Sequence, residues 1–140
     1  MRFVKGKTKM VKYPNAITNV YLKGALVYFN GSGAVIPADS TSGDHVGITM
    51  EAIPATDARY TTAGKILVEV PIEKDVEFES AVTADLAASS VGVAMDLTDS
   101  VTVDATTPAK FVVTCVGFIS ATKGRFVLNA HFEHYRVATT

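Results

Sequence analysis

The sequence contains no tryptophan and only one cysteine among its 140 residues. A single cysteine excludes an internal disulfide and the disulfide-dense frameworks of small secreted domains. Cys115 lies inside the apolar run 111–116. We therefore expect a buried core residue there and not a nucleophile, because a reactive thiol needs an accessible, electropositive setting.

Long apolar stretches are also missing. The first residues lack the apolar stretch of a signal peptide, and no segment approaches the length of a membrane span. We expect a protein that is made and kept inside a cell, or inside something the cell assembles, with no membrane partner. Hydrophobic residues make up 48% of the chain and charged residues 19%, which favours one packed domain over disorder.

Charge is distributed unevenly along the chain. The net charge is −1, yet six basic residues precede the first acidic residue, Asp39, and five of them lie within residues 1–12. Residues 1–19 lack a core-like period, so we predict an extended N-terminal arm before a single β domain over residues 20–140. We expect the arm to bind a partner through its basic side chains, Arg2, Lys5, Lys7, Lys9 and Lys12.

Nucleic acid is one conceivable partner, because neutralising phosphates requires only basic charge. The body of the chain is acidic, however, and the aromatic residues of the arm, Phe3 and Tyr13, are too sparse for a base-stacking platform. These features argue against nucleic acid.

Several short segments are typical of β-strands. The apolar runs 24–29 and 34–36 flank an Asn-Gly turn signal, which predicts a hairpin. Residues 76–80 alternate apolar and polar, and from 125 to 133 one face carries Phe126, Leu128, Ala130 and Phe132. The one helix candidate, 83–88, supports at most two turns.

These patterns predict an all-β fold. We expect a compact antiparallel β-sandwich or small barrel of β-tulip type, with at most one short helix.

Two pairs of similar segments occur at the same spacing. Residues 45–52 resemble 90–97, and 64–70 resemble 109–115, both at an offset of 45 residues. The shared offset predicts an internal repeat over 45–70 and 90–115. Gly47 and Gly92 occupy matching positions, where glycine permits a bulge or the close approach of another backbone.

No motif predicts a catalytic, cofactor or metal site. Residues 6–8 read Gly-Lys-Thr, but the glycine that a phosphate-binding loop requires five positions earlier does not exist. On a strand, the odd spacing of His131 and His134 sends the two rings to opposite faces. His45 is distant from both in sequence, and we expect it to serve packing.

An acidic cluster, Glu73, Asp75, Glu77 and Glu79, remains open to interpretation. Two carboxylates facing a cleft are the arrangement for glycoside hydrolysis, which would make the chain a hydrolase. We favour a solvated strand face, because no tryptophan platform for a sugar exists. The cluster is also suited to receive a basic arm from a neighbouring subunit.

Taken together, the chain resembles the capsid decoration (cement) proteins of tailed bacteriophages. The resemblance rests on the change from start to body at 17–20 (Ile-Thr-Asn-Val), on the opening 23–27 (Lys-Gly-Ala-Leu-Val), and on the recurrent Val-Gly-Ile/Val-x-Met step. It implies a small, β-rich virion protein without enzymatic activity or cofactor.

The resemblance also implies a location and partners. The chain would be made in the host cytoplasm and located on the capsid exterior, as a homotrimer that binds the major capsid protein and stabilises the shell. The alternatives are a non-enzymatic ligand- or carbohydrate-binding β module, or another phage structural component such as a tail or fibre protein.

Overall fold

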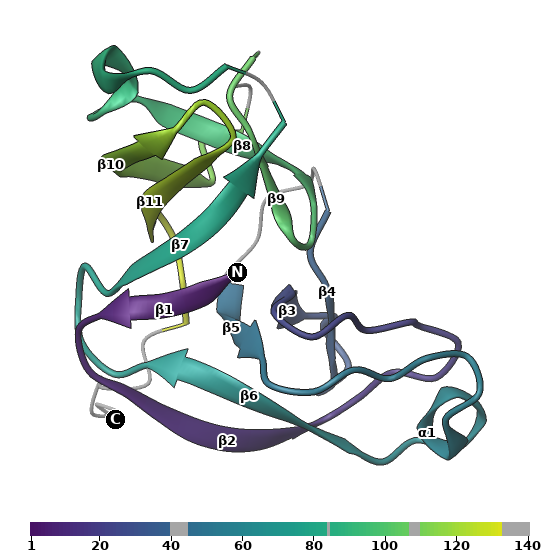
Figure 1. The fold of residues 1–140 in the computed structure, drawn as a ribbon. Helices are drawn as coiled ribbons and strands as arrows, with labels where there is room; N and C mark the ends of the chain where they lie inside the picture. Colours follow the sequence, from purple (N-terminus) through teal and green to yellow (C-terminus); the bar gives the residue numbers. More distant parts are fainter. Residues whose placement is uncertain (40–44, 84, 107–109, 133–140) are drawn as a thin grey trace.

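Strands dominate the molecule (Figure 1). The computed structural model describes residues 1–39, 45–83, 85–106 and 110–132. The helical elements are α1 (Ala58–Thr61) and the 3-10 turn η1 (Ala88–Ser90). The strands are β1 (Arg2–Lys5), β2 (Thr8–Pro14), β3 (Leu26–Phe29), β4 (Val35–Pro37), β5 (His45–Thr49), β6 (Lys65–Pro71), β7 (Glu77–Val82), β8 (Ala94–Asp99), β9 (Thr102–Asp104), β10 (Val113–Ser120) and β11 (Lys123–Leu128).

The strands form two sheets, and each sheet closes on itself. The first has the order β2-β6-β5-β3-β4, and a parallel bridge between Asn15 and Val35 joins its ends. The second contains β7-β11-β10-β8-β9, and a parallel pairing of β9 with β7 closes it, while β1 adds to the edge of β7. We call β2–β6 the first barrel and β7–β11 the second barrel. The all-β, small-barrel prediction is confirmed.

Each barrel has its own apolar interior. The first is filled by Tyr21, Val27, Val35, Val46, Ile53, Ile66, Val68 and Val70, all with 0% exposure. The second is filled around Phe78 and Phe126, whose ring centroids lie 5.9 Å apart, and it includes the single cysteine. Cys115 is fully buried, as predicted, and burial raises the pKa of its thiol.

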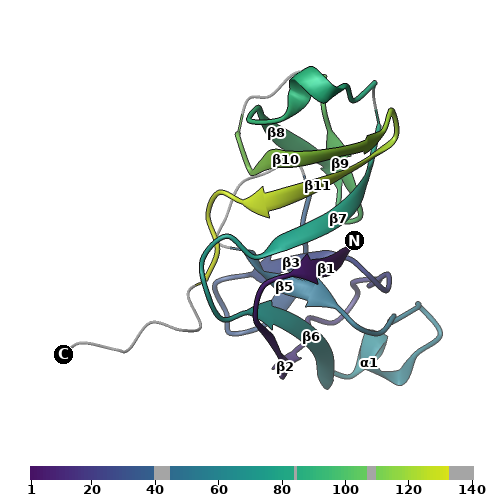
Figure 2. The same cartoon turned by 60° about the vertical axis from the view of Figure 1, so that its left-hand side comes forward.

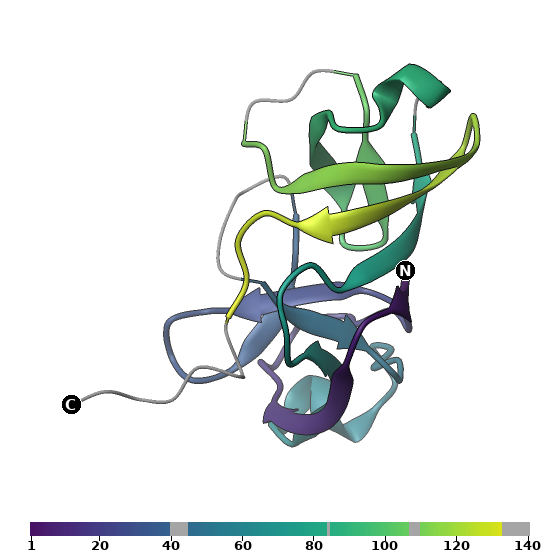
Figure 3. The ribbon, with the colours of Figure 1, turned by 90° about the vertical axis from the view of Figure 1, so that its left-hand side faces the viewer.

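The two barrels share a core where they meet. Leu26, Ala38 and Ile48 lie on the outer face of the first barrel but belong to the apolar cluster of the second. All five residues of β5 are therefore buried, because one face of the strand points into the first barrel and the other onto the second. In Figures 2 and 3 the second barrel accordingly sits directly on the first.

The N-terminal segment is extended, as expected, but it does not stand apart from the body. β1 pairs with β7 of the second barrel, and β2 pairs with β6 over its full length in the first barrel. Phe3 packs edge-on against Phe78 at 6.3 Å, and Val11 and Tyr13 pack against the first core. In place of a free arm, residues 2–14 are thus edge strands of both sheets.

The two barrels have the same topology. In sequence order, the five strands of the first barrel are arranged 2-6-5-3-4, and those of the second 7-11-10-8-9, with a parallel contact closing each ring. Each strand of the first barrel thus has a counterpart five strands later: β2 corresponds to β7, and β3, β4, β5 and β6 correspond to β8, β9, β10 and β11. The chain is an internal duplication at the level of the fold.

Individual hydrogen bonds repeat between the barrels. In the first, Gly24 N–H donates to the Thr49 carbonyl (2.9 Å), and Thr49 N–H donates to Ala25 (2.8 Å). In the second barrel the same pair of bonds runs from Gly92 N–H to Cys115 (2.7 Å) and from Cys115 N–H to Val93 (3.0 Å). The equivalent residues lie 66 to 68 positions apart, as the numbering shows.

This spacing differs from the predicted repeat of 45 residues. That offset sets β5 beside the start of β8, although the topological counterpart of β5 is β10. The two glycines it matched also differ. A Cβ at Gly47 would lie 2.1 Å from the Glu69 carbonyl oxygen, whereas Gly92 has a positive φ of 89° and open space around it. Part of the second segment, 107–109, lies outside the described residues.

The predicted hairpin is confirmed. β3 and β4 pair antiparallel through Phe29 and Val35, and the Asn30 side chain accepts hydrogen bonds from the N–H groups of Ser32 and Ala34. The strand at 76–80 is confirmed as β7. The closing strand is shorter than predicted, because β11 ends at Leu128, and Phe132 beyond it is 44% exposed.

The helix prediction was wrong in position. Within 83–88 the described residues form no α-helix, Ala84 lies outside them, and η1 begins only at Ala88. Among the described residues the α-helix is the single turn α1, and the Asp57 carboxylate caps it by accepting from Arg59 N–H at 2.8 Å.

Candidate functional site

Among the described residues, a group of charged side chains lies on the outer face of β7. Phe78 points into the second barrel and is fully buried, so the alternation of the strand turns Glu77 and Glu79 outward. β1 and β11 flank β7 on either side, and Arg2 and Arg125 both stand opposite Glu79. Basic strands thus enclose an acidic strand.

Glu79 is held by two cations. Its carboxylate lies 2.7 Å from Lys123 Nζ and 3.6 Å from an Arg2 guanidinium nitrogen. Only 14% of the Glu79 side chain is exposed. The hydrogen bond from Lys123, and then the nearby positive charges, hold the pKa of Glu79 below its usual value.

Glu77 repeats the arrangement one step along the strand. Its carboxylate oxygens lie 3.7 Å from Lys5 Nζ and 3.8 Å from Arg125. We call these six residues the charged face: Arg2, Lys5, Glu77, Glu79, Lys123 and Arg125. Four cations around two carboxylates leave the face with a net positive charge. The basic N-terminal segment does meet the acidic cluster, but within one chain.

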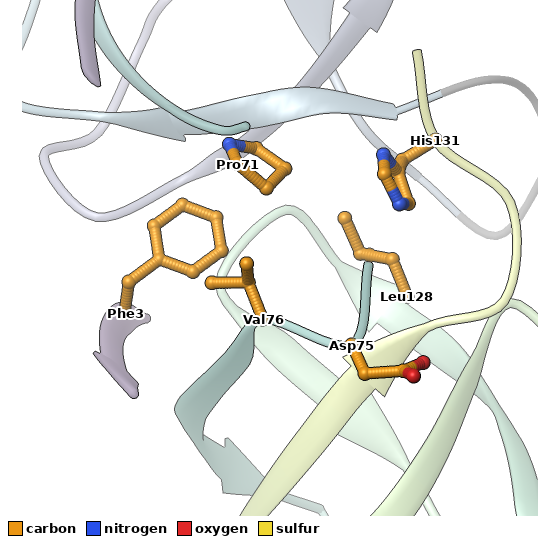
Figure 4. A pocket seen from close by; sticks show the side chains of 6 residues that line it. All are labelled: Phe3, Pro71, Asp75, Val76, Leu128 and His131. Atoms are coloured by element: carbon orange, nitrogen blue, oxygen red, sulfur yellow. The ribbon is translucent and has the colours of Figure 1, made fainter. Parts of the chain in front are cut away.

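The other two acidic residues of the predicted cluster lie elsewhere. Glu73 accepts a hydrogen bond from the Lys7 backbone N–H at 2.8 Å. Asp75, with a positive φ of 58°, lines a narrow crevice between the barrels together with Phe3, Pro71, Val76, Leu128 and His131 (Figure 4). The crevice has about 10 Å³ of free space, which is room for one water.

This arrangement does not match the hydrolase alternative. Glycoside hydrolysis requires one carboxyl with a raised pKa to act as the general acid. The pKa of Glu79 is lowered instead, and both Glu77 and Glu79 are engaged by cations. The hollow beside Glu79, about 230 Å³ and lined also by Met1, Arg2, Ser80, Ala81 and Lys123, is open and shallow.

The five predicted partner-binding residues do not form one site. All are exposed, but Arg2 and Lys5 lie on β1 in the charged face, whereas Lys9 and Lys12 lie on β2 at the edge of the first barrel. Lys7 lies in the turn between the two strands. The segment therefore presents basic side chains to two different surfaces.

Exposed apolar side chains are one feature that the sequence did not reveal. On the first barrel, the connection from β2 to β3 exposes Ile17, Val20 and Leu22, each by 47 to 50%. On the second barrel, Val91, Val93, Phe111, Phe118 and Ile119 are 43 to 53% exposed. Periodicity does not mark these residues, because apolar side chains in loops and at strand ends carry no signal of their burial.

A polar network that the sequence did not reveal supports the first barrel. The Asn15 side chain is almost fully buried; it donates to the Arg59 carbonyl at 2.9 Å and accepts from Gly64 N–H at 3.0 Å. Arg59 in turn binds the carboxylates of Asp57 and Glu51. The network ties the loop around α1 to β2 and has a structural role.

Within the described ranges, no three His, Cys, Asp or Glu side chains are grouped as metal ligands, and no helix is long and apolar enough to cross a membrane. His45 is buried with its ring 6.2 Å from Tyr28, and His134 lies outside the described residues.

No known family model matches the sequence, and no curated protein is significantly similar to it.

Proposed function

We propose that the chain is a structural virion protein that binds the outside of a phage capsid and bridges neighbouring capsid subunits. The single observation that supports this proposal best is that each barrel exposes its own set of apolar side chains, while a shared core joins the barrels. Two contact surfaces on one rigid body are what bridging two neighbours requires.

Rigidity at the junction favours such a role. Leu26, Ala38 and Ile48 are buried between the barrels, and Leu26 N–H donates to the Ser100 carbonyl at 2.7 Å. A rigid connection lets the second contact form at a high effective concentration once the first has formed. Repeated over a symmetric shell, many weak contacts of this kind would resist outward pressure from packaged DNA.

We further propose that the protein acts as a homotrimer with the major capsid protein as its partner. The resemblance to capsid decoration proteins supports the partner and the oligomer. The positive charged face and the basic β2 edge offer electrostatic guidance for binding, which sets register and association rate more than affinity.

Reconstitution on particles tests the proposal. Heads assembled from the major capsid protein encoded in the same genome, but without this chain, would be mixed with the purified full-length protein and separated on a density gradient. We expect saturable binding at a fixed ratio to the capsid protein and a higher temperature of head rupture. Heads that bind none of the protein would overturn the proposal.

Matched variants assign the contact surfaces. Leu22→Ser and Phe118→Ser each remove an exposed apolar side chain from a different barrel, so each should lower occupancy on heads about ten-fold while the free protein stays folded. Thr62→Ser and Thr122→Ser, at exposed polar positions of the same barrels, are the controls. Equal occupancy for all four variants would exclude these surfaces as contacts.

A further inference from the structure

The internal duplication places a strand beside β7 that has no counterpart beside β2. Glu79 pairs with Arg125 of β11 on one side and with Arg2 of β1 on the other. Ala81 likewise pairs with Lys123 on one side and with Thr102 of β9 on the other. β1 and β9 therefore share the same edge of β7, one after the other.

The equivalent edge of β2 is only half occupied. Asn15 at the end of β2 contacts Val35 of β4, just as Val82 of β7 pairs with Val103 of β9. By this correspondence the residues of β7 that pair with β1, 77–79, match residues 10–12 of β2. Among the described residues, no strand pairs with β2 there, because β2 ends the sheet order and forms its margin in Figure 1.

Backbone groups of this edge point outward. Ile72 N–H donates to the Lys7 carbonyl, and Asn15 N–H donates to the Gly64 carbonyl. Between these ends the register with β6 runs without a bulge, so the odd-numbered residues of β2 bond to β6. Met10 and Lys12 therefore turn their N–H and C=O groups to the open edge, where a further strand would bond to them.

Side chains at the open edge define what would bind. Lys9 and Lys12 are exposed, and Met10 is 52% exposed. In the second barrel the edge strand is acidic, with Glu77 and Glu79, and the strand seated on it is basic, with Arg2 and Lys5. At β2 the charges are reversed, so the complementary strand is acidic.

We infer that β2 is a docking edge for an extended, acidic segment of a partner protein, which adds an antiparallel strand along residues 10–12. Lysine on an edge strand discourages unspecific pairing with apolar strands, and it selects an acidic one. A second copy of this chain is disfavoured as the occupant, because its own β1 and β2 edges are basic. The inference stands independently of the proposed role on a capsid.

Amide exchange in the full-length chain tests the docking edge. The probe is an end-capped, eight-residue peptide of Thr, Val and Glu, and the matched control peptide carries Lys in place of Glu. At saturating acidic peptide we expect exchange of the Met10 and Lys12 amides to slow at least ten-fold. The amides of Lys9 and Val11 already bond to β6, so their exchange should change less than two-fold.

Substitutions separate the backbone and charge contributions. Met10→Pro removes an outward N–H that β6 does not use, and we expect at least ten-fold weaker peptide binding. The double variant Lys9→Glu with Lys12→Glu should weaken peptide binding at least five-fold. It tests the charge contribution independently of whether Met10→Pro folds. Lys74→Glu with Lys110→Glu, at exposed lysines outside β2, is the control and should bind as the parent does.

Three outcomes would overturn the inference. The first is an acidic peptide that leaves the β2 amides unprotected at millimolar concentration, and the second is a lysine peptide that protects them equally. The third is self-association of the chain alone, seen by sedimentation, that protects Met10 and Lys12 without any peptide. None of these results bears on binding to capsids, so failure here is distinguishable from failure of the proposed function.

Discussion

Gly24 and Gly92 hold the same place in the two barrels. Both have a left-handed backbone, with φ of 78° and 89°, and both donate their N–H to the carbonyl of a strand that follows, at Thr49 and Cys115. Each glycine leads the chain into the second strand of its barrel, β3 or β8. The surroundings of the two glycines differ, so the same substitution should have different effects on stability at the two positions.

Replacing each glycine by alanine should destabilise the protein to different degrees. At Gly92 a Cβ meets nothing within 4 Å, so only the cost of the left-handed backbone applies, about 1 kcal/mol. At Gly24 the Cβ would lie 2.8 Å from the Met1 carbonyl oxygen, which raises the expected loss to roughly 2 to 3 kcal/mol. Urea unfolding of both variants measures the difference, and a larger loss at Gly92 would contradict it.

Removing the Tyr21 hydroxyl should weaken the first barrel. This group donates to the Val35 carbonyl at 2.5 Å and accepts from Ala16 N–H at 3.0 Å, inside the core. Tyr21→Phe leaves the Val35 carbonyl and the Ala16 N–H without this hydrogen-bond partner, so it should lower the free energy of unfolding by about 1 to 3 kcal/mol. Tyr60→Phe, on the partly exposed helix α1, is the control, with an expected change below about 0.5 kcal/mol.

The charged face should make stability depend on pH. The pKa of Glu79 is lower in the folded than in the unfolded protein. The ionised Glu79 therefore stabilises the folded state above pH 4.5, the ordinary pKa of a glutamate, and this stabilisation is lost as pH falls through the folded pKa. Thermal unfolding of the parent and of Glu79→Gln between pH 7 and pH 3 should show the parent more stable at pH 7.

This stability advantage of the parent should shrink below about pH 4.5. It should also diminish in high salt, because the four cations of the charged face are 46 to 73% exposed and salt screens exposed charges. A carbon-13 titration of the Glu79 carboxyl checks the direction independently. A folded pKa above the ordinary value would contradict the arrangement of Lys123 and Arg2 around it.

Local chemistry made several elements predictable. The hairpin of β3 and β4 follows from an Asn-Gly turn between apolar runs, and β7 follows from strict alternation around Phe78. Both signals depend only on residues a few positions apart. The burial of Cys115 was predictable for the same reason, because it lies within a continuous apolar run.

The misplaced features have a common physical cause. β2 escaped notice because it is an edge strand, and such a strand buries only part of one face and carries lysine on the rest. The 45-residue offset matched residues of the same type. Equivalent positions in the two barrels instead share the direction of the side chain, inward or outward, and the same backbone hydrogen bonds. Many different residues satisfy that requirement, so the duplication leaves little trace in the sequence.

The sequence by itself determined that this chain is all-β, that Cys115 is buried, and that basic residues crowd the first strands. Composition, alternation and turn residues are local properties, and they decide secondary structure and burial. Only the tertiary structure decided that β1 and β2 serve different barrels and that the barrels repeat one topology. It also decided that Glu79 meets Arg2 and that residues 10–12 lie at an open edge. Those relations depend on strand pairing between residues far apart in the chain, which no local pattern specifies.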